Sequence, residues 1–380
     1  MIIDRYNVGY GLSRSLVGLV RYYSSSVTKR RPDLLSILPK KKIINKLLFD
    51  FNSRLTYKKA LPVLESIYKH LDSPEEIILP NYVKGQDLMT LKSMLSGVRK
   101  VTNTIETNLV NLETELVEQA AEMGNNDAIT ILAFDTIQNS SSTKEDYRYA
   151  TSLIKELTDM KHPLVFKMGG DLAFKKKYYE QAEYYWLDFL KVESDTIAAA
   201  QVYSNLGIYY FSYLRPRPNL TKAKLCFEKS IKLGELDEYT VRSHYYLGQL
   251  YAITEPQLSR YHLEIAACKA LKESFLTLGF LEMNVFNNLN SAYEWFKLGV
   301  EASKDLTCMM GQFDCLIRLE RFKDAASTLK TLNTISQQIK KLSGKGDLLA
   351  DVKEHIMTND ALLKLFFDTR RNEVDLLRNL

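Results

Sequence analysis

Cysteine is scarce in this chain, and its scarcity excludes two classes of protein. Four cysteines among 380 residues, with no CxxC pair, exclude a disulfide framework of the kind that secreted domains use and a thiolate zinc site. We expect all four to be small hydrophobic side chains on apolar, buried helix faces. They are Cys226, Cys268, Cys308 and Cys315.

Catalytic motifs and long apolar runs are also missing. The five histidines are dispersed, there is no HExxH or GxSxG, and Ser343-Gly344-Lys345-Gly346 is too short for a phosphate loop. The sequence therefore predicts no enzyme, no cofactor and no metal site. No run reaches the roughly 18 apolar residues of a membrane span, so we expect a soluble or peripheral protein.

Proline is sparse, and strand-like alternation with hairpin signals is absent. Helix-period apolar patterns dominate instead, which predicts an all-α fold. The stretch from Phe166 to Leu190 is typical of two short antiparallel helices, in which Gly170 and Ala182 permit close approach and Trp186 fills the space beside them. A single helix pair cannot bury its apolar faces alone, so it needs similar neighbours.

Four similar units follow this stretch. The first-helix markers of the five units, this stretch included, are residues 170, 207, 248, 279 and 313, which lie 37, 41, 31 and 34 residues apart, and Phe313 takes the place of glycine in the last unit. These units resemble tetratricopeptide repeats, and residues 118–128 resemble the related Sel1-type unit. The resemblance implies a right-handed α-solenoid of degenerate tetratricopeptide/Sel1-like helix pairs.

The pattern predicts five segments. Residues 61–162 are an N-terminal helical region with the Sel1-like unit, residues 163–335 are the repeats, and residues 336–380 are C-terminal capping helices. Within the first of these, residues 86–123 form a long helical stretch with its expected break near Gly97. Gly124 should then end a helix in the left-handed conformation, with Asn126 or Asp127 capping the next, and Thr143 or Ser142 should cap the helix through Leu157. The two other segments precede residue 61.

Residues 1–23 are basic, amphipathic and poor in acids, which is typical of a mitochondrial transit peptide. We expect cleavage between Tyr23 and Ser24. Residues 24–60 contain ten Lys and Arg against two Asp, a charge of about +8. We expect this segment to contact an anionic partner, either RNA or the inner-membrane lipid surface, unless it is only a solvated face. The lipid-contact candidates are Lys29, Arg30, Arg31, Lys40, Lys41 and Lys42, with apolar residues from Ile43 to Phe49 dipping into the interface.

Several blocks taken together point to one family. Arg54-Leu55-Thr56-Tyr57, residues 121–132, residues 278–288 and residues 294–297 resemble the yeast mitochondrial cytochrome c oxidase assembly factors that are required for export of the subunit II C-terminal tail. The resemblance spans most of the chain after residue 23. It implies a protein bound peripherally to the matrix side of the mitochondrial inner membrane. Its partners would be the subunit II tail and an Oxa1-type inner-membrane insertase.

Tetratricopeptide arrays bind peptides on the surface formed by their first helices, so the resemblance also implies a peptide-binding groove. Its positions here are Lys167, Asp171, Phe174, Ile208, Phe211, Tyr245, Gln249, Phe280, Met283 and Asn284. The alternative for these side chains is that they only pack the solenoid. Two other functions stay open, an RNA-binding translational activator and a general insertase-associated scaffold, although the repeats show no base-reading pattern and no nucleic acid is expected.

Overall fold

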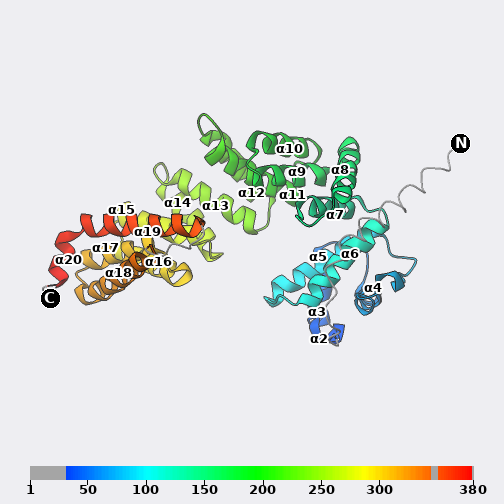
Figure 1. Cartoon of the computed structure of the whole chain (residues 1–380), viewed down its shortest axis with the longest axis horizontal. Helices are drawn as coiled ribbons and strands as arrows, with labels where there is room; N and C mark the ends of the chain where they lie inside the picture. The colour runs from blue at the N-terminus through cyan, green and yellow to red at the C-terminus, as the bar shows by residue number, and fades with distance from the viewer. Residues whose placement is uncertain (1–30, 344–349, 379–380) are drawn as a thin grey trace. The chain divides into compact units, whose positions relative to one another are not determined.

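The structure, a computed structural model, describes residues 31–343 and 350–378 (Figure 1). Over these residues it contains helices and no strand, so the predicted all-α class is confirmed. The chain divides into two compact units, Met1–Val192 and Glu193–Leu380. The sequence predicted one repeat array over residues 163–335, whereas the unit boundary separates the first helix pair of that array from the other four. The predicted transit peptide and its cleavage site lie outside the described residues.

Unit 1 contains nine α-helices in the described residues and one short 3-10 turn. The helices are α2 (Leu34–Ile37), α3 (Lys41–Asp50), α4 (Tyr57–Lys69), α5 (Gly85–Thr102), α6 (Thr107–Glu122), α7 (Asn126–Gln138), α8 (Lys144–Asp159), α9 (Pro163–Lys175) and α10 (Tyr179–Val192), and the turn is η2 (Pro74–Glu76). The most extensive contacts join helices that are neighbours in sequence: α5 with α6, α7 with α8, and α9 with α10. Helices α2 to α7 share one hydrophobic core that extends from Leu34 to Leu132.

Gly97 does not break the helix, contrary to the prediction. It lies inside α5, where α3 packs so closely that an added Cβ would lie 3.0 Å from Leu47 and 3.1 Å from Phe51. The helix ends instead at Asn103, which adopts a positive φ of 50°. Glycine is present at residue 97 because a neighbouring helix needs the space, and this long-range cause leaves no local signal.

The prediction for the turn between α6 and α7 is correct for the glycine. The N-cap of α7 lies one residue before the predicted Asn126. Gly124 has a φ of +77°, the left-handed conformation that glycine tolerates best. The N-cap of α7 is Asn125, whose side chain accepts a hydrogen bond from the backbone N–H of Ala128 at 3.0 Å. Thr143 caps α8 as predicted.

Unit 2 continues the helix pairs. Its elements are α11 (Ile197–Ile208), the π-helical turn η3 (Tyr209–Tyr213), α12 (Leu220–Leu233), α13 (Glu238–Tyr251), α14 (Pro256–Cys268), α15 (Lys272–Asn284), α16 (Leu289–Ser303), α17 (Leu306–Arg318), α18 (Phe322–Ser343), α19 (Ala350–Thr369) and α20 (Arg371–Arg378). Each odd-numbered helix from α11 to α17 packs on the helix that follows it. Helix α18 runs across residues 335 and 336, where the sequence predicted a boundary.

The glycine markers are sites of close helix approach within each pair. A Cβ added at Gly279 in α15 would lie 2.4 Å from the ring of Phe296 in α16. The same relation joins Gly207 to Phe227 and Gly248 to Leu263 in unit 2, and Gly170 to Trp186 in unit 1. Each large side chain is fully buried, and burial of one such ring contributes roughly 1.5–3 kcal/mol.

The last pair reverses this size relation. Phe313 in α17 replaces the glycine and is fully buried, while α18 supplies the smaller Ala325 and Leu329. The ring of Phe313 packs edge-to-face on Phe366 of α19, with centroids 5.2 Å apart. In this pair the first helix supplies the aromatic ring, which fills the space that the smaller side chains of α18 leave between the two helices.

The cysteine prediction holds for two of the four residues. Cys308 and Cys315 are buried, Cys226 is half-buried and Cys268 is exposed at the end of α14. Burial raises the pKa of Cys308 and of Cys315 to about 12. The prediction is wrong for Cys268, because it lies on the exposed side of the last turn of α14, whose Ala266 and Ala267 are buried.

Candidate peptide-binding site

The ten predicted groove positions lie on first helices of their pairs. They are Lys167, Asp171 and Phe174 on α9, Ile208 and Phe211 at the end of α11 and in η3, Tyr245 and Gln249 on α13, and Phe280, Met283 and Asn284 on α15. Nine of them are half-buried or exposed, and Met283 is buried. The α9 residues belong to unit 1 and the others to unit 2, so we describe the two sets separately.

In unit 1 the polar residues of this set bind one another. Asp171 accepts hydrogen bonds from Lys167 Nζ at 3.1 Å and from Trp186 Nε1 at 3.0 Å. Phe174 packs against Trp186 and Tyr179, with ring centroids 5.4 Å apart in both cases. The Asp171 carboxylate is therefore neutralised within its own helix pair. Phe174 is half-buried by its contacts with Trp186 and Tyr179.

In unit 2 an aromatic cluster begins at the π-helical turn. Phe211 lies 5.0 Å from Tyr246 on α13, and Tyr246 stacks on Phe227 at 5.2 Å with nearly parallel rings. Tyr246 was not predicted as a site residue. Its position, directly after the predicted Tyr245, gave no signal because a helix places adjacent residues on different faces. Contacts of α12 with α13 and with η3 bring these aromatic rings together.

Tyr245 is the centre of a polar contact between α13 and α15. Its hydroxyl accepts a hydrogen bond from Gln249 Nε2 at 2.7 Å and also bonds to the side chain of Thr277. Burial raises the pKa of Tyr245, although the bonds from Thr277 and Gln249 act in the opposite direction. At neutral pH the phenol therefore stays protonated and keeps both hydrogen bonds.

The three α15 residues differ in exposure. Phe280 is 37% exposed while one edge of its ring packs on Phe296 at 5.3 Å, and Asn284 is exposed. Met283 is only 8% exposed, and its sulfur lies 3.8 Å from Cys315 Sγ on α17. Met283 therefore packs between first helices, which is the alternative that the sequence left open for this set.

The predicted lipid-contacting segment is only partly available to a membrane. Lys40, Lys41 and Lys42 are exposed, Arg31 pairs with Asp72, and Lys29 and Arg30 lie outside the described residues. Ile44, Leu47 and Leu48 are buried in the core and cannot dip into an interface. The expectation that this apolar run meets lipid is therefore wrong for those three residues.

Phe49 is the exception on α3, because 81% of its surface is exposed. It shares the solvent-facing side of the helix with Lys42 and Lys46, which are also exposed and precede it by seven and three residues. An aromatic ring with two cations beside it matches the chemistry of an anionic interface, where apolar and basic groups act together.

Two histidines that are far from any motif meet in unit 2. His244 on α13 and His262 on α14 are joined by a hydrogen bond between their Nδ1 atoms at 2.9 Å. Burial lowers the pKa of His244 to about 4, and the neighbouring His262 acts in the same direction. Burial also lowers the pKa of His262, which Glu228 partly counteracts. No sequence pattern predicts that the pair meets, beyond its place in adjacent helices.

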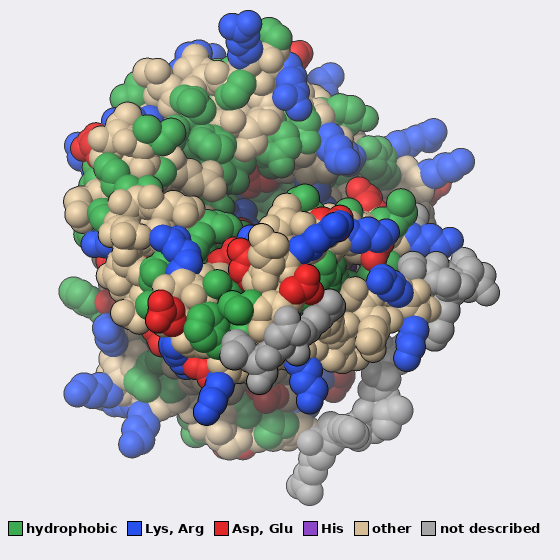
Figure 2. Space-filling view, turned by 90° about the vertical axis from the view of Figure 1, so that its left-hand side faces the viewer, with side chains coloured by type: hydrophobic (Ala, Val, Ile, Leu, Met, Phe, Trp, Pro, Cys, Tyr) green, Lys and Arg blue, Asp and Glu red, His purple; other side chains and the backbone are tan. Residues whose placement is uncertain are grey.

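Other chemical sites are few in the part of the chain that the structure describes. No three His, Cys, Asp or Glu side chains gather there as metal ligands, and none of its helices has the length and apolar character to span a membrane. Lys, Arg, Asp and Glu are interspersed with hydrophobic side chains on the face shown in Figure 2. A hollow of about 400 Å³ lies among α18, α19 and α20, where it is lined by charges of both signs.

The chain is similar to known proteins over most of its length. Residues 30–125 match the model of the MSS2 N-terminal domain family. The protein "MSS2, mitochondrial" of Saccharomyces cerevisiae is 34% identical over 350 residues, which cover 90% of this chain and 93% of the yeast protein.

Three solved structures are similar at lower identity. A Sel1 repeat protein from Oxalobacter formigenes is 13% identical, with 63% of this chain and 98% of that chain covered and a TM-score of 0.43. The type IV pilus biogenesis factor PilW is 20% identical, with coverages of 55% and 92% and a TM-score of 0.39. Yeast Tom70 is 11% identical, with coverages of 96% and 71% and a TM-score of 0.38. Because the yeast relative matches along nearly the whole chain, this chain belongs to the MSS2 family.

Proposed function

We propose that this protein is a non-enzymatic mitochondrial assembly factor of cytochrome c oxidase. In this role it holds the C-terminal tail of subunit II before the tail is exported across the inner membrane. The observation that supports this proposal most strongly is the 34% identity to the yeast mitochondrial protein over 90% of the chain. Helix pairs with exposed aromatic side chains on their first helices suit a protein that binds peptides.

The tail would lie on the first-helix residues of unit 2. Ile208, Phe211 and Phe280 offer apolar surface, and Gln249 and Asn284 offer amide groups beside it. Apolar burial contributes roughly 25 cal/mol per Å², but ordering a flexible chain offsets much of this gain. Weak and reversible binding is the expected result, and it allows transfer of the tail to an Oxa1-type insertase.

The place of action would be the matrix side of the inner membrane. The predicted transit peptide, residues 1–23, would direct import and be removed between Tyr23 and Ser24. Lys42, Lys46 and Phe49 would then contact the lipid surface peripherally. N-terminal sequencing of the protein from purified mitochondria tests the import step, and a first residue other than Ser24 contradicts the predicted cleavage.

The experiment that tests the function is pulse-labelling of mitochondrial translation products in cells without this gene, followed by protease treatment of mitoplasts. We expect subunit II to be made at a normal rate while its C-terminal tail stays protected from protease. If subunit II is not synthesised, the protein acts in translation and the RNA-binding alternative replaces the proposal. If the tail is exported normally, the proposal is wrong.

The binding surface is tested by a double variant, Ile208→Ala with Phe280→Ala, in the same assay. Both residues are partly exposed, so the fold should survive, which circular dichroism checks. Ile253→Ala is the matched control, because Ile253 is 93% exposed and follows α13 without belonging to the set. Protection of the tail in the double variant but not in the control supports the assignment, and export in both contradicts it.

A further inference from the structure

The first-helix surface of unit 2 carries an acidic side chain, Asp314, whose charge is neutralised by a basic partner. Asp314 follows the marker Phe313 as Gln249 follows Gly248 and Phe280 follows Gly279, so the three occupy one repeat position. Both oxygens of Asp314 bind Arg370, at 2.5 Å and 2.6 Å. This bidentate pair comes from within unit 2, so a ligand meets no free carboxylate there.

Two further charged side chains near the aromatic cluster have opposite signs. Tyr246 lies close enough to Arg242 and Glu273 for both to act on its pKa, which burial raises. The two side chains have opposite signs and come from α13 and α15. These two charges offset each other beside Tyr246, so a charged ligand there would lose hydration against Phe211 and Tyr246 with little compensation.

Gln249 remains as the polar group at the centre of this surface. One N–H of its amide is used by Tyr245 at 2.7 Å. No group among the described residues donates a hydrogen bond to its Oε1, and the side chain is half-buried. A primary amide presents both a donor and an acceptor, which is the pattern of the peptide backbone itself.

The spacing of the neighbours sets the conformation of a ligand. Packed helices lie about 8–10 Å apart, so Ile208 on α11 and Phe280 on α15 are separated by about 20 Å with α13 between them. An extended chain advances about 3.3 Å per residue. Two apolar side chains about six residues apart would reach both contacts, whereas a helical ligand would need about twice as many residues.

We infer that the first-helix surface of unit 2 binds an extended, uncharged peptide segment, with Gln249 hydrogen-bonded to its main chain and Ile208 and Phe280 each contacting one apolar side chain. The inference rests on the proposed peptide-holding function and names the chemistry of the segment. It predicts that peptides are selected by their main chain and by the spacing of their apolar side chains. Neither a free C-terminal carboxylate nor a basic segment would determine binding.

The test uses the full chain and a fluorescent synthetic peptide of Ser, Thr and Gln with two Leu residues about six positions apart, measured by fluorescence anisotropy. We expect binding that weakens about tenfold when the central amides are N-methylated or when Gln249→Leu is introduced. Gln257→Leu, an exposed amide on the second helix α14, is the matched control and should not alter affinity. Addition of two Lys or two Asp to the peptide should weaken binding.

Three outcomes overturn the inference: no binding of the uncharged peptide, tighter binding of a charged one, or no effect of both N-methylation and Gln249→Leu. The result is separable from the proposed function. If the subunit II tail is exported through this protein but these changes have no effect, only the inference fails. If the uncharged peptide binds as expected while tail export is normal without the gene, only the proposed function fails.

Discussion

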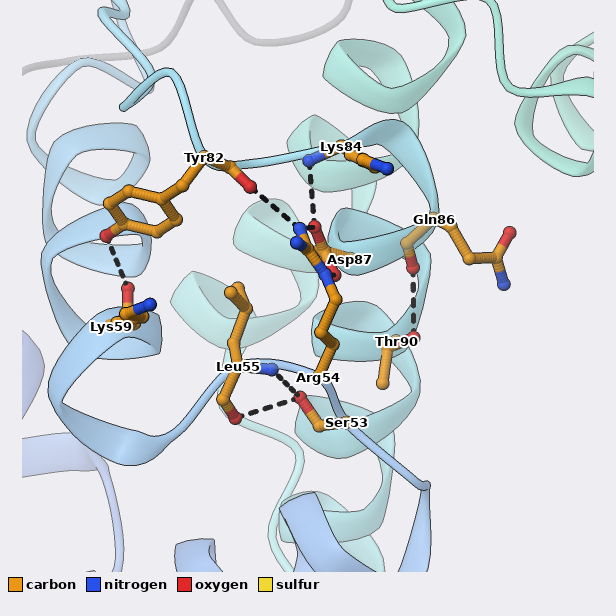
Figure 3. Close-up of polar contacts among 9 residues, drawn as sticks. All are labelled: Ser53, Arg54, Leu55, Lys59, Tyr82, Lys84, Gln86, Asp87 and Thr90. Carbon is orange, nitrogen blue, oxygen red and sulfur yellow. Dashed lines mark hydrogen bonds and ion pairs between the residues drawn. The ribbon is translucent and has the colours of Figure 1, made fainter.

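Arg54 and Asp87 bind each other across 33 residues and connect the segment before α4 to the first turn of α5 (Figure 3). Arg54 Nε lies 3.1 Å from Asp87 Oδ1, and a second nitrogen of the guanidinium pairs with Oδ2. The same guanidinium donates to the Tyr82 carbonyl at 2.7 Å, and the Lys84 backbone N–H donates to Asp87 at 2.8 Å. All four residues lie in the part that matches the MSS2 N-terminal domain.

Replacement of Arg54 by Met should destabilise unit 1. The Asp87 side chain is 7% exposed, so without Arg54 its carboxylate would be buried with only one backbone donor. Burial by itself raises the pKa of Asp87, but the bonds from Arg54 and Lys84 outweigh it and the pKa is lowered. The pair therefore stabilises the fold above the unfolded-state pKa near 3.8 and loses this effect as the pH falls below it.

The measurement for this prediction is the urea midpoint at neutral and at acidic pH. Arg321→Met is the control, because Arg321 pairs with Asp324 on the surface at i, i+3, where both side chains are exposed. We expect a lower midpoint for Arg54→Met at neutral pH and little change for the control. Equal midpoints for both variants would mean that the buried pair contributes nothing.

Gly279→Ala should destabilise unit 2 by about 1–3 kcal/mol, because the new methyl group would overlap the ring of Phe296. Phe296→Leu in the same chain should recover part of the loss by vacating the space. Gly169→Ala is the control in unit 1, since its Cβ would meet Tyr185 at an ordinary 3.6 Å. Thermal unfolding of the three variants checks the prediction, and an unchanged stability of Gly279→Ala contradicts it.

The His244–His262 pair should make the protein sensitive to mild acid. Both imidazoles have a pKa lowered below the ordinary 6.5, that of His244 to about 4, so the unfolded chain binds more protons between these values. Stability should fall as the pH drops from 6.5 toward 4 and be constant above it. Urea midpoints over this range check the slope.

The control for this slope is a double variant, His244→Leu with His262→Phe, in which neither ring can titrate. We expect a smaller fall in stability between pH 6.5 and about 4 than in the unmodified chain. Identical slopes in the unmodified chain and the double variant would assign the acid sensitivity to other groups.

Phe49→Ala should weaken binding to vesicles that contain anionic phospholipid. Loss of the ring removes roughly 2 kcal/mol of apolar transfer, which corresponds to about a 30-fold change in partition. Flotation of the full chain with such vesicles measures this. Ile105→Ala is the matched control, because Ile105 is 85% exposed in the same unit. Equal loss for both variants would mean that exposure alone, and not the basic surroundings of Phe49, decides binding.

The cysteines should differ in reactivity. Cys268 is exposed, whereas burial raises the pKa of Cys308 and of Cys315 to about 12 and keeps both as thiols at neutral pH. A thiol-specific reagent should therefore modify Cys268 in the native protein and the two buried residues only after denaturation. Mass spectrometry of the labelled protein identifies the sites, and early modification of Cys315 would contradict its burial.

Local patterns were sufficient for the helix pairs and insufficient for their contacts. Gly279 and Phe296 are close in sequence, and their sizes alone indicate that one helix approaches the other. Gly97 is also a glycine inside an apolar helical stretch, but the side chains that pack against it are Leu47 and Phe51, which are about fifty residues away. The predicted helix break failed there because nothing near Gly97 distinguishes a breaker from a site of close packing.

The candidate binding residues divide in the same way. The repeat register placed Phe280 and Gln249 on first helices, where both remain accessible in part. It also included Met283, and only the neighbouring α17 decides that this side chain is buried against Cys315. The apolar run before Phe49 looked equally suited to lipid contact, but Ile44, Leu47 and Leu48 are buried in the core.

The all-α class, the helix pairs and the family follow from the amino-acid sequence alone, because they depend on periodicity, small residues at fixed spacing and similarity along the chain. Which polar groups meet depends on the three-dimensional packing. Arg54 reaches Asp87, and His244 reaches His262, through packing of helices that no local preference specifies. A hydrogen bond depends on distances of about 3 Å, and a sequence pattern determines which face a residue occupies but not which partner lies opposite.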